Sequence, residues 1–193
     1  MESNEFKSIE ITKLPDETEF YSYSQISKVF GEIKRKEIQL SDAILILLNA
    51  QPDNPIFGRI SLMKQMYLLL NEELRSEDVQ DGNFVPYYYG WFSFQIINNL
   101  KNLEYLGYIE KKGKKNTRNE QFRISGKGKK FITPLFSSLP EEAQENIRDK
   151  RKGWDQLGCD GILNYVYSKY PDSKERSKLK ERYKSIKWGR SKA

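Results

Sequence analysis

The chain contains almost no residues suited to thiol or zinc chemistry. Its 193 residues include one cysteine, Cys159, and no histidine. An internal disulfide needs two cysteines and the usual zinc sites need several Cys or His ligands, so both are excluded. The usual catalytic triad and any imidazole base are excluded as well. We therefore expect no metal, no cofactor and no enzymatic activity.

Carboxylates are the one remaining metal-binding chemistry. An acidic stretch could in principle hold Mg²⁺, although adjacent acids at a helix end are more often a solvated surface. The residues concerned are Glu72, Glu73, Glu77, Asp78 and Asp81.

Long apolar runs are also missing. The longest, Ala43 to Leu48, falls far short of the roughly 20 residues that span a bilayer. Residues 1–10 lack the pattern of a secretory signal. A hydrophobic fraction of 37% suffices for one core. We expect a soluble, cytoplasmic protein with no membrane partner and one compact domain with appendages.

Positive charge is concentrated in two segments. Residues 110–130 hold nine Lys or Arg against two Glu, and residues 174–193 hold the same numbers, so each carries +7. Subtracting both from the net charge of +6 leaves −8 for the rest. An acidic body with two basic appendages is suited to phosphate contact, but Lys-rich hairpins and tails also occur for solubility alone.

Apolar spacing divides the chain into four parts: an N-terminal arm and helix (1–40), a core (41–139), a C-terminal helical extension (140–173) and a basic tail (174–193). The arm lacks periodicity up to residue 24, and a helix is expected over 24–36. Helices of the core are expected over 43–49, with Ser41 and Asp42 as caps, over 59–74 with an amphipathic pattern, and over 93–106 with a stop at Gly107.

The core continues with a hairpin and more helices. Strands are expected at 108–112 and 121–125, with an exposed polar tip at 113–120. A loop is expected at 51–57 because it contains two prolines. Helices then follow up to 139, over 141–157 and over 161–170. These elements predict an α+β, mostly helical fold: a winged helix-turn-helix core with a β-hairpin wing, an N-terminal arm and a C-terminal helical extension.

Five short strings carry a narrower resemblance. They are GRISLMKQMYLLL (58–70), FVPYYYGWFS (84–93), LEYLGYI (103–109), FRISGKG (122–128) and LNYVYSKYP (163–171). They are similar to the uncharacterised YwgA-like proteins and the related SocA-like, or Panacea, domains of bacteria, archaea and their phages. The resemblance spans about residues 43–171. It implies a winged helix, DNA or partner binding, and a role in regulation, toxin neutralisation or phage conflict, and it implies no catalytic residues.

In a winged helix the third helix reads the major groove and the wing contacts the backbone nearby. The expected outward positions of the third helix are Ser93, Gln95, Asn98, Asn99, Lys101 and Asn102. Asn and Gln can bond adenine and Lys can reach guanine or phosphate, but such residues also form the ordinary polar face of a helix. The expected phosphate contacts are Lys111, Lys112, Lys114, Lys115, Arg118, Arg123, Lys127 and Lys129, the last two helped by backbone amides at a helix start.

An aromatic cluster precedes the third helix. Phe92 and Phe94 are expected in the core, whereas Tyr88 and Trp91 are kept as surface anchors for a partner. Tyr165, Tyr167 and Tyr170 are expected to pack the last helix onto the body or a second subunit.

Two functions follow from these patterns. The first is a nucleic-acid-binding regulator, expected to be a dimer that contacts phosphate through the basic hairpin and the basic tail, with DNA preferred over RNA. The second is a protein-interaction module, antitoxin-like or phage-associated, in which the winged helix is a scaffold and the aromatic surface binds a partner protein.

Overall fold

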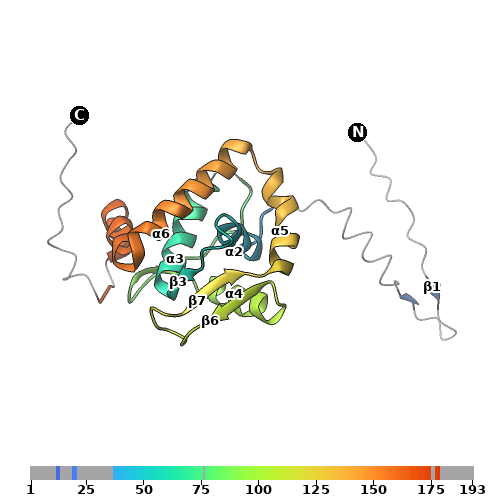
Figure 1. Cartoon of the computed structure of the whole chain (residues 1–193), viewed down its shortest axis with the longest axis horizontal. Helices are drawn as coiled ribbons and strands as arrows, with labels where there is room; N and C mark the ends of the chain where they lie inside the picture. The colour runs from blue at the N-terminus through green and yellow to red at the C-terminus, as the bar shows by residue number, and fades with distance from the viewer. Residues whose placement is uncertain (1–11, 14–18, 21–36, 76, 175–176, 179–193) are drawn as a thin grey trace. The chain divides into compact units, whose positions relative to one another are not determined.

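The computed structural model describes residues 12–13, 19–20, 37–75, 77–174 and 177–178 (Figure 1). The chain separates into two units, Met1–Lys36 and Glu37–Ala193. In the first unit, β1 (Thr12–Lys13) and β2 (Glu19–Phe20) pair in antiparallel fashion, with Thr12 opposite Phe20. The helix expected over 24–36 and nearly all of the basic tail lie outside the described residues.

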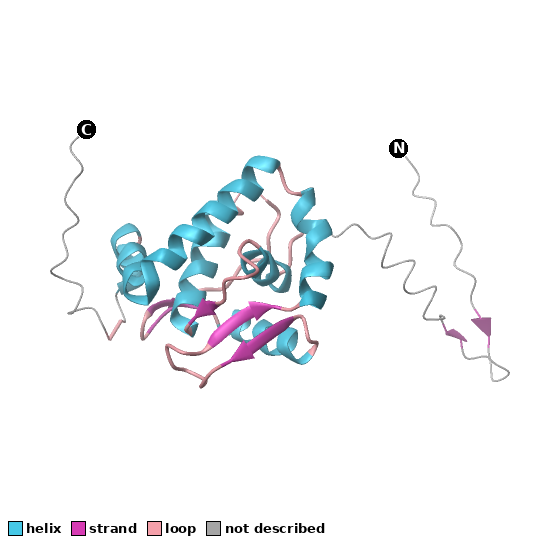
Figure 2. Ribbon diagram, viewed as in Figure 1, coloured by secondary structure: helices cyan, strands magenta, loops and turns pink. Residues whose placement is uncertain are grey.

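The second unit is mostly helical, as Figure 2 shows. The fold is α+β with about 59% helix, and its described part holds five α-helices and small antiparallel sheets. The α+β, mostly helical prediction is confirmed. No helix in the described ranges is both long enough and apolar enough to cross a bilayer.

Helix α2 (Leu40–Asn49) forms the centre of the core, packed against α4 (Phe94–Tyr105) and α5 (Gly126–Ser138). Its run from Ala43 to Leu48 is fully buried, as expected for a helix without a polar face. The predicted caps are wrong. The helix begins three residues earlier than expected, and Gln39 precedes it, with its backbone N–H donating to the Asp42 carboxylate at 3.3 Å.

Helix α3 (Arg59–Leu68) continues into a π-helical turn, η1 (Leu69–Glu73). The predicted helix is confirmed, but its amphipathic character is wrong, because every residue from Ser61 to Leu68 is buried. Helix α6 (Glu141–Lys169) packs along α3 and covers the side of Gln65, whose side-chain amide donates to Asp155 at 3.1 Å. Lys64 is buried beside strand β5 (Gly90–Phe92), where its ammonium donates to the Trp91 carbonyl.

The larger sheet has three strands in the order β3-β7-β6, all antiparallel. Strands β6 (Ile109–Lys112) and β7 (Gln121–Ile124) form the predicted hairpin, with Ile109 opposite Ile124. Strand β3 (Ile56–Phe57) corrects the prediction of a loop over 51–57, because Ile56 pairs with Phe122 and both are buried.

A second hairpin leads into helix α4 (Phe94–Tyr105). Its strands are β4 (Val85–Tyr87) and β5 (Gly90–Phe92). Ser93 caps α4 as predicted, since its Oγ accepts the Ile96 N–H at 3.2 Å. Gly107, at φ 73°, follows the helix in the left-handed conformation that a glycine stop requires.

Helices α5 (Gly126–Ser138) and α6 (Glu141–Lys169) complete the unit, with a short 3₁₀ turn, η2 (Pro171–Lys174). Gly158 breaks α6 with φ 62° and ψ −174°, so the two predicted helices are confirmed as segments on either side of it. Tyr167 is buried, and Tyr170 packs edge-on against Tyr67 with ring centroids 5.0 Å apart. The last segment thus packs onto the body as predicted.

Candidate nucleic-acid interface and aromatic surface

The outer face of α4 is polar. Gln95, Asn98, Lys101 and Asn102 are exposed, while Asn99 is half-buried and its side-chain amide donates to the Gln95 carbonyl at 3.0 Å. Ser93 is fully buried, so the prediction that it faces solvent is wrong. Its hydroxyl is already used as the helix cap and cannot also read a base.

The lysines of the β6–β7 hairpin fall into two groups. Lys112, Lys114 and Lys115 are exposed. Lys111 instead forms an ion pair with Glu104 of α4. Strand alternation explains the difference, because Lys111 shares a face with the buried Ile109 and therefore points toward α4. This ion pair joins the hairpin to the helix beside it.

The two arginines of the hairpin reach other segments. Arg118 is 71% exposed, and its Nη2 lies 3.4 Å from the Asp160 carboxylate of α6. Arg123 is exposed and donates to the Asp53 carbonyl at 3.3 Å. Both retain donors for other acceptors, because a guanidinium carries five N–H groups.

The tip of this hairpin is anchored to the body. Glu120 was expected to be exposed, but it is 0% exposed and accepts from Arg59 at 2.7 Å and from the Asn116 N–H at 2.8 Å. The Gly58 N–H also donates to the Glu120 carbonyl at 2.6 Å. The prediction of an exposed tip is therefore wrong at Glu120, because Arg59 at the start of α3 supplies the opposite charge.

Lys127 and Lys129 follow the hairpin, and both are exposed. Lys127 donates to the Leu106 carbonyl at 2.8 Å and lies 4.5 Å from the Tyr108 ring centroid. A cation is favoured there because α4 ends at this carbonyl. The backbone amides expected to bind phosphate are partly occupied, since the Gly128 N–H donates to Ser125 Oγ and the Lys129 N–H to the Ser125 carbonyl.

Four rings form what we call the aromatic surface: Tyr87, Tyr88, Phe92 and Phe94. Tyr87 contacts the other three, with centroids 4.4 to 5.6 Å apart. Phe94 is 55% exposed, so its predicted place in the core is wrong, and Phe92 is only half-buried. Phe94 is the first residue of α4, and at this end of the helix its side chain faces solvent.

The sequence leaves both Tyr88 and Trp91 as surface anchors, but the structure places them in different surroundings. Tyr88 is exposed in the turn between β4 and β5, and Lys178 Nζ lies 4.0 Å from its ring centroid. Trp91 is half-buried and stacks on Tyr67 at 5.8 Å with nearly parallel rings. Trp91 therefore belongs to the packing of α3.

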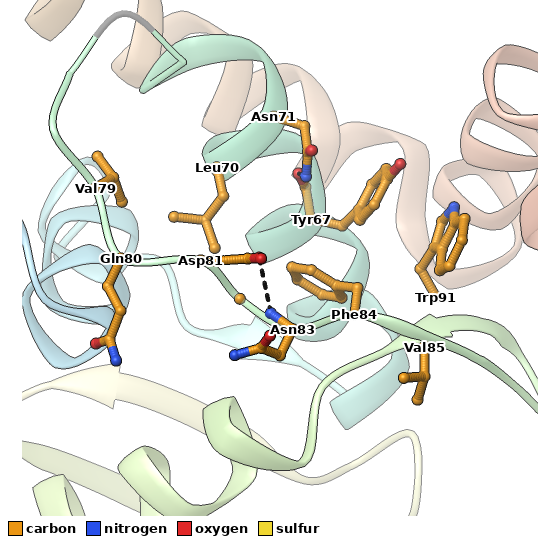
Figure 3. Close-up of a pocket in the computed structure, with 11 residues that line it drawn as sticks. Tyr67, Leu70, Asn71, Val79, Gln80, Asp81, Asn83, Phe84, Val85 and Trp91 are labelled. Carbon is orange, nitrogen blue, oxygen red and sulfur yellow. Dashed lines mark hydrogen bonds between the residues drawn. The ribbon is translucent and has the colours of Figure 1, made fainter.

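A cavity of about 430 Å³ lies on the Trp91 side. Figure 3 shows the residues that line it. Tyr67, Phe84 and Trp91 form its aromatic part, and an Asp81 carboxylate oxygen accepts the Asn83 N–H at 2.9 Å along its floor. Asn83 has a positive φ of 46°, which this Asx turn accommodates.

A second cavity, of about 510 Å³, lies on the other side of the β4–β5 hairpin, and we call it the tyrosine cavity. Residues from α3, the turn of the β4–β5 hairpin and the tip of the β6–β7 hairpin line it, together with Cys159. The buried Lys64 is part of its wall and donates to the Trp91 carbonyl at 2.7 Å. The sequence signal for this site is Lys64, a lysine inside an apolar helical stretch.

The acidic stretch is tied to the C-terminal segment. Glu72 accepts from the Tyr170 hydroxyl at 2.6 Å and pairs with Lys169 at 2.8 Å. Burial and the hydrogen bond to Glu72 raise the pKa of the Tyr170 hydroxyl. Within the ranges that the structure describes, no three His, Cys, Asp or Glu side chains are grouped to hold a metal ion.

Comparison with known proteins identifies no relative: no protein-family model matches the chain, and no curated protein matches it.

Proposed function

We propose that the second unit is a winged helix. The supporting observation is the order of its elements: α2, β3, α3, α4 and then the β6–β7 hairpin, with β3 added to the outer side of β7. In this arrangement α4 takes the place of the recognition helix and the hairpin takes the place of the wing. The β4–β5 hairpin is then an insertion ahead of the recognition helix.

We propose nucleic-acid binding, with DNA preferred, as the function of this domain. The observation that carries the proposal is the pairing of the polar face of α4 with the exposed lysines of the neighbouring hairpin. Amide side chains on α4 have the donors and acceptors to contact base edges, and Lys112, Lys114 and Lys115 have the charge to contact phosphates. Three such contacts correspond to modest, salt-sensitive affinity.

Charge reversal tests this proposal. Fluorescence anisotropy with a random-sequence duplex, a single strand and an RNA hairpin, each at low and physiological salt, should give duplex binding that weakens with salt. Lys114→Glu/Lys115→Glu should weaken duplex binding by about tenfold or more at low salt. Lys150→Glu/Lys152→Glu is the matched control, because these exposed lysines of α6 make the same change in net charge away from the hairpin. Absence of duplex binding at low salt, or equal loss in both variants, would exclude this function.

A second candidate is a protein-interaction module, as the resemblance to the YwgA-like and SocA-like proteins also suggests. The aromatic surface favours it, because contiguous exposed rings commonly mark partner binding. Affinity capture from host cells with Tyr88→Ala/Phe94→Ala should lose a partner that the wild type retains. Tyr105→Ala is the control, since Tyr105 is an exposed aromatic at the opposite end of α4. Retention of every captured protein by the double variant would argue against this candidate.

A further inference from the structure

The tyrosine cavity has the size and surface of a small-molecule site. Its volume of about 510 Å³ falls within the range of about 300 to 1,000 Å³ that is usual for ligand pockets. Tyr87, Tyr88 and Phe92 contribute rings to one side, and Ile60 and Met63 of α3 contribute apolar surface. A flat, apolar ring system fits such walls because it can stack or pack edge-on against them.

The charges around this cavity are all of one sign. Among the described residues that line it, Arg59, Lys64 and Arg118 are basic, and none is Asp or Glu. Arg59 pairs with Glu120 and Arg118 lies near Asp160, so both arginines have acidic neighbours behind the wall. Lys64 makes no ion pair within the described part of the chain, and it is 1% exposed.

A buried ammonium without an opposite charge is costly unless its donors are bonded. Lys64 Nζ donates to the Trp91 carbonyl at 2.7 Å, and an ammonium has three N–H donors. An acidic group entering the cavity would supply both an opposite charge and further acceptors. A ligand that complements this cavity therefore carries an anionic group and an apolar ring.

We propose that the tyrosine cavity binds a small aromatic carboxylate, with its ring against Tyr87, Phe92 and Met63 and its carboxylate at Lys64 Nζ. Arg118, at the tip of the β6–β7 hairpin, provides a second cation at the cavity wall. The cavity shares Tyr87, Tyr88 and Phe92 with the aromatic surface and Arg118 with the basic hairpin. The proposal nevertheless does not depend on either function proposed above.

Protonation of Lys64 makes the affinity of the site for its ligand depend on pH. Burial lowers the pKa of Lys64 to about 7, and Cys159 acts in the opposite direction. A bound carboxylate stabilises the ammonium, so binding takes up a proton and affinity falls as pH rises above about 7. The other charged or titratable groups of the wall are Arg59, Tyr87, Tyr88, Tyr89, Arg118 and Cys159, with Glu120 and Asp160 behind the arginines.

Titration of the full chain with three probes, followed by ¹H–¹⁵N NMR, tests the proposal. The probes are 2-naphthoate, its neutral amide 2-naphthamide, and cyclohexanecarboxylate, which keeps the charge but lacks the aromatic ring. We expect saturable shifts at Tyr87–Tyr89 and Asn116–Arg118 with 2-naphthoate, and binding about tenfold or more weaker for the other two. Affinity for 2-naphthoate should decrease from about pH 6 to about pH 9.

Variants identify the charged partner. Lys64→Met should weaken 2-naphthoate binding about tenfold or more and remove its advantage over the amide, whereas Lys152→Met, at an exposed lysine of α6 outside the cavity, should leave binding of both unchanged. If Lys64→Met fails to fold, Arg118→Gln should reduce the advantage of the acid over the amide. Absence of saturable shifts, equal binding of acid and amide by the wild type, or shifts confined to the cavity of Tyr67 and Phe84 would overturn the proposal.

Discussion

Two groups of cations in this protein have opposite environments. Lys112 and Lys115 of the β6–β7 hairpin are exposed, whereas Lys64 of α3 and Arg151 of α6 are almost completely buried. A count of net charge treats all four alike. The exposed lysines contribute to the field around the molecule, while the buried ones hold elements together. A charge count taken from the sequence therefore says something about a charged surface, but it does not show which cations are buried and bonded inside the fold.

The buried cations connect segments that are distant in sequence. Arg151 donates to the Asn54 carbonyl at 3.1 Å and forms an ion pair with Asp155, which joins α6 to the loop before β3. Lys64 joins α3 to β5 through the Trp91 carbonyl. In both places burial disfavours the charge and lowers its pKa, to about 10 for Arg151 and about 7 for Lys64. Hydrogen bonds offset part of that cost.

The largest expected effect is the loss of Arg151. Arg151→Met leaves the Asp155 carboxylate and the Asn54 carbonyl without this partner, and we expect the free energy of unfolding to fall by about 3 to 5 kcal/mol. Urea unfolding measures the change. Lys152→Met, at the exposed neighbouring position, should change it by no more than about 0.5 kcal/mol. Similar values for both variants would mean that burial of Arg151 contributes little.

The second effect is a pH dependence of stability caused by Lys64. Its folded pKa of about 7 lies below the ordinary 10.5, so between these values the unfolded chain binds more protons and stability rises with pH. Below about pH 7 Lys64 is charged in the folded and the unfolded state, so the full cost of burying its charge lowers the free energy of unfolding. From about pH 7 to about pH 9, Lys64 should add about 2 kcal/mol to the free energy of unfolding.

Urea unfolding of the wild type and Lys64→Met across that window measures the difference in slope. This pH window ends before tyrosines titrate. The pKa values of Tyr67, Tyr167 and Tyr170 are raised in the folded state, so their titration lowers the free energy of unfolding only at higher pH. Lys115→Met should keep the wild-type slope. A slope that Lys64→Met leaves unchanged would assign the pH dependence to another group.

The third effect concerns the exposed lysines, and it is smaller for each residue. Lys115→Gln should lower duplex affinity by only about two- to fivefold at low salt, because one phosphate contact is lost. The plot of log affinity against log salt should become shallower by about 0.9. Lys152→Gln should leave that slope unchanged. A slope equal to that of the wild type in Lys115→Gln would remove this lysine from the interface.

The smallest effect is expected for Arg118 and Asp160. The two side chains are 71% and 44% exposed and lie 3.4 Å apart, so solvent screens their attraction. A double-mutant cycle with Arg118→Gln and Asp160→Asn should give a coupling below about 0.5 kcal/mol. A coupling above about 1 kcal/mol would show that solvent does not screen this pair as its exposure implies.

Local patterns explain which predictions from sequence succeeded. The Ser93 cap, the Gly107 stop and the break at Gly158 each depend on neighbouring residues and on backbone conformations that single residues favour. The β6–β7 hairpin follows from alternation within two short strands. Each of these features can be read from one short continuous stretch of sequence, because the hydrogen bonds involved are local.

The sequence by itself thus determined an α+β chain rich in helix, where its helices stop, and a basic hairpin after α4. Only the tertiary structure decided that α6 covers the outer face of α3, that Arg59 draws Glu120 inside, and that Phe94 faces solvent. The physical reason is that a helix pattern shows which residues share a face, whereas burial depends on the elements packed against that face. Lys64 is part of a ligand-sized cavity through such packing, with α3, two hairpins and Cys159 each contributing one wall.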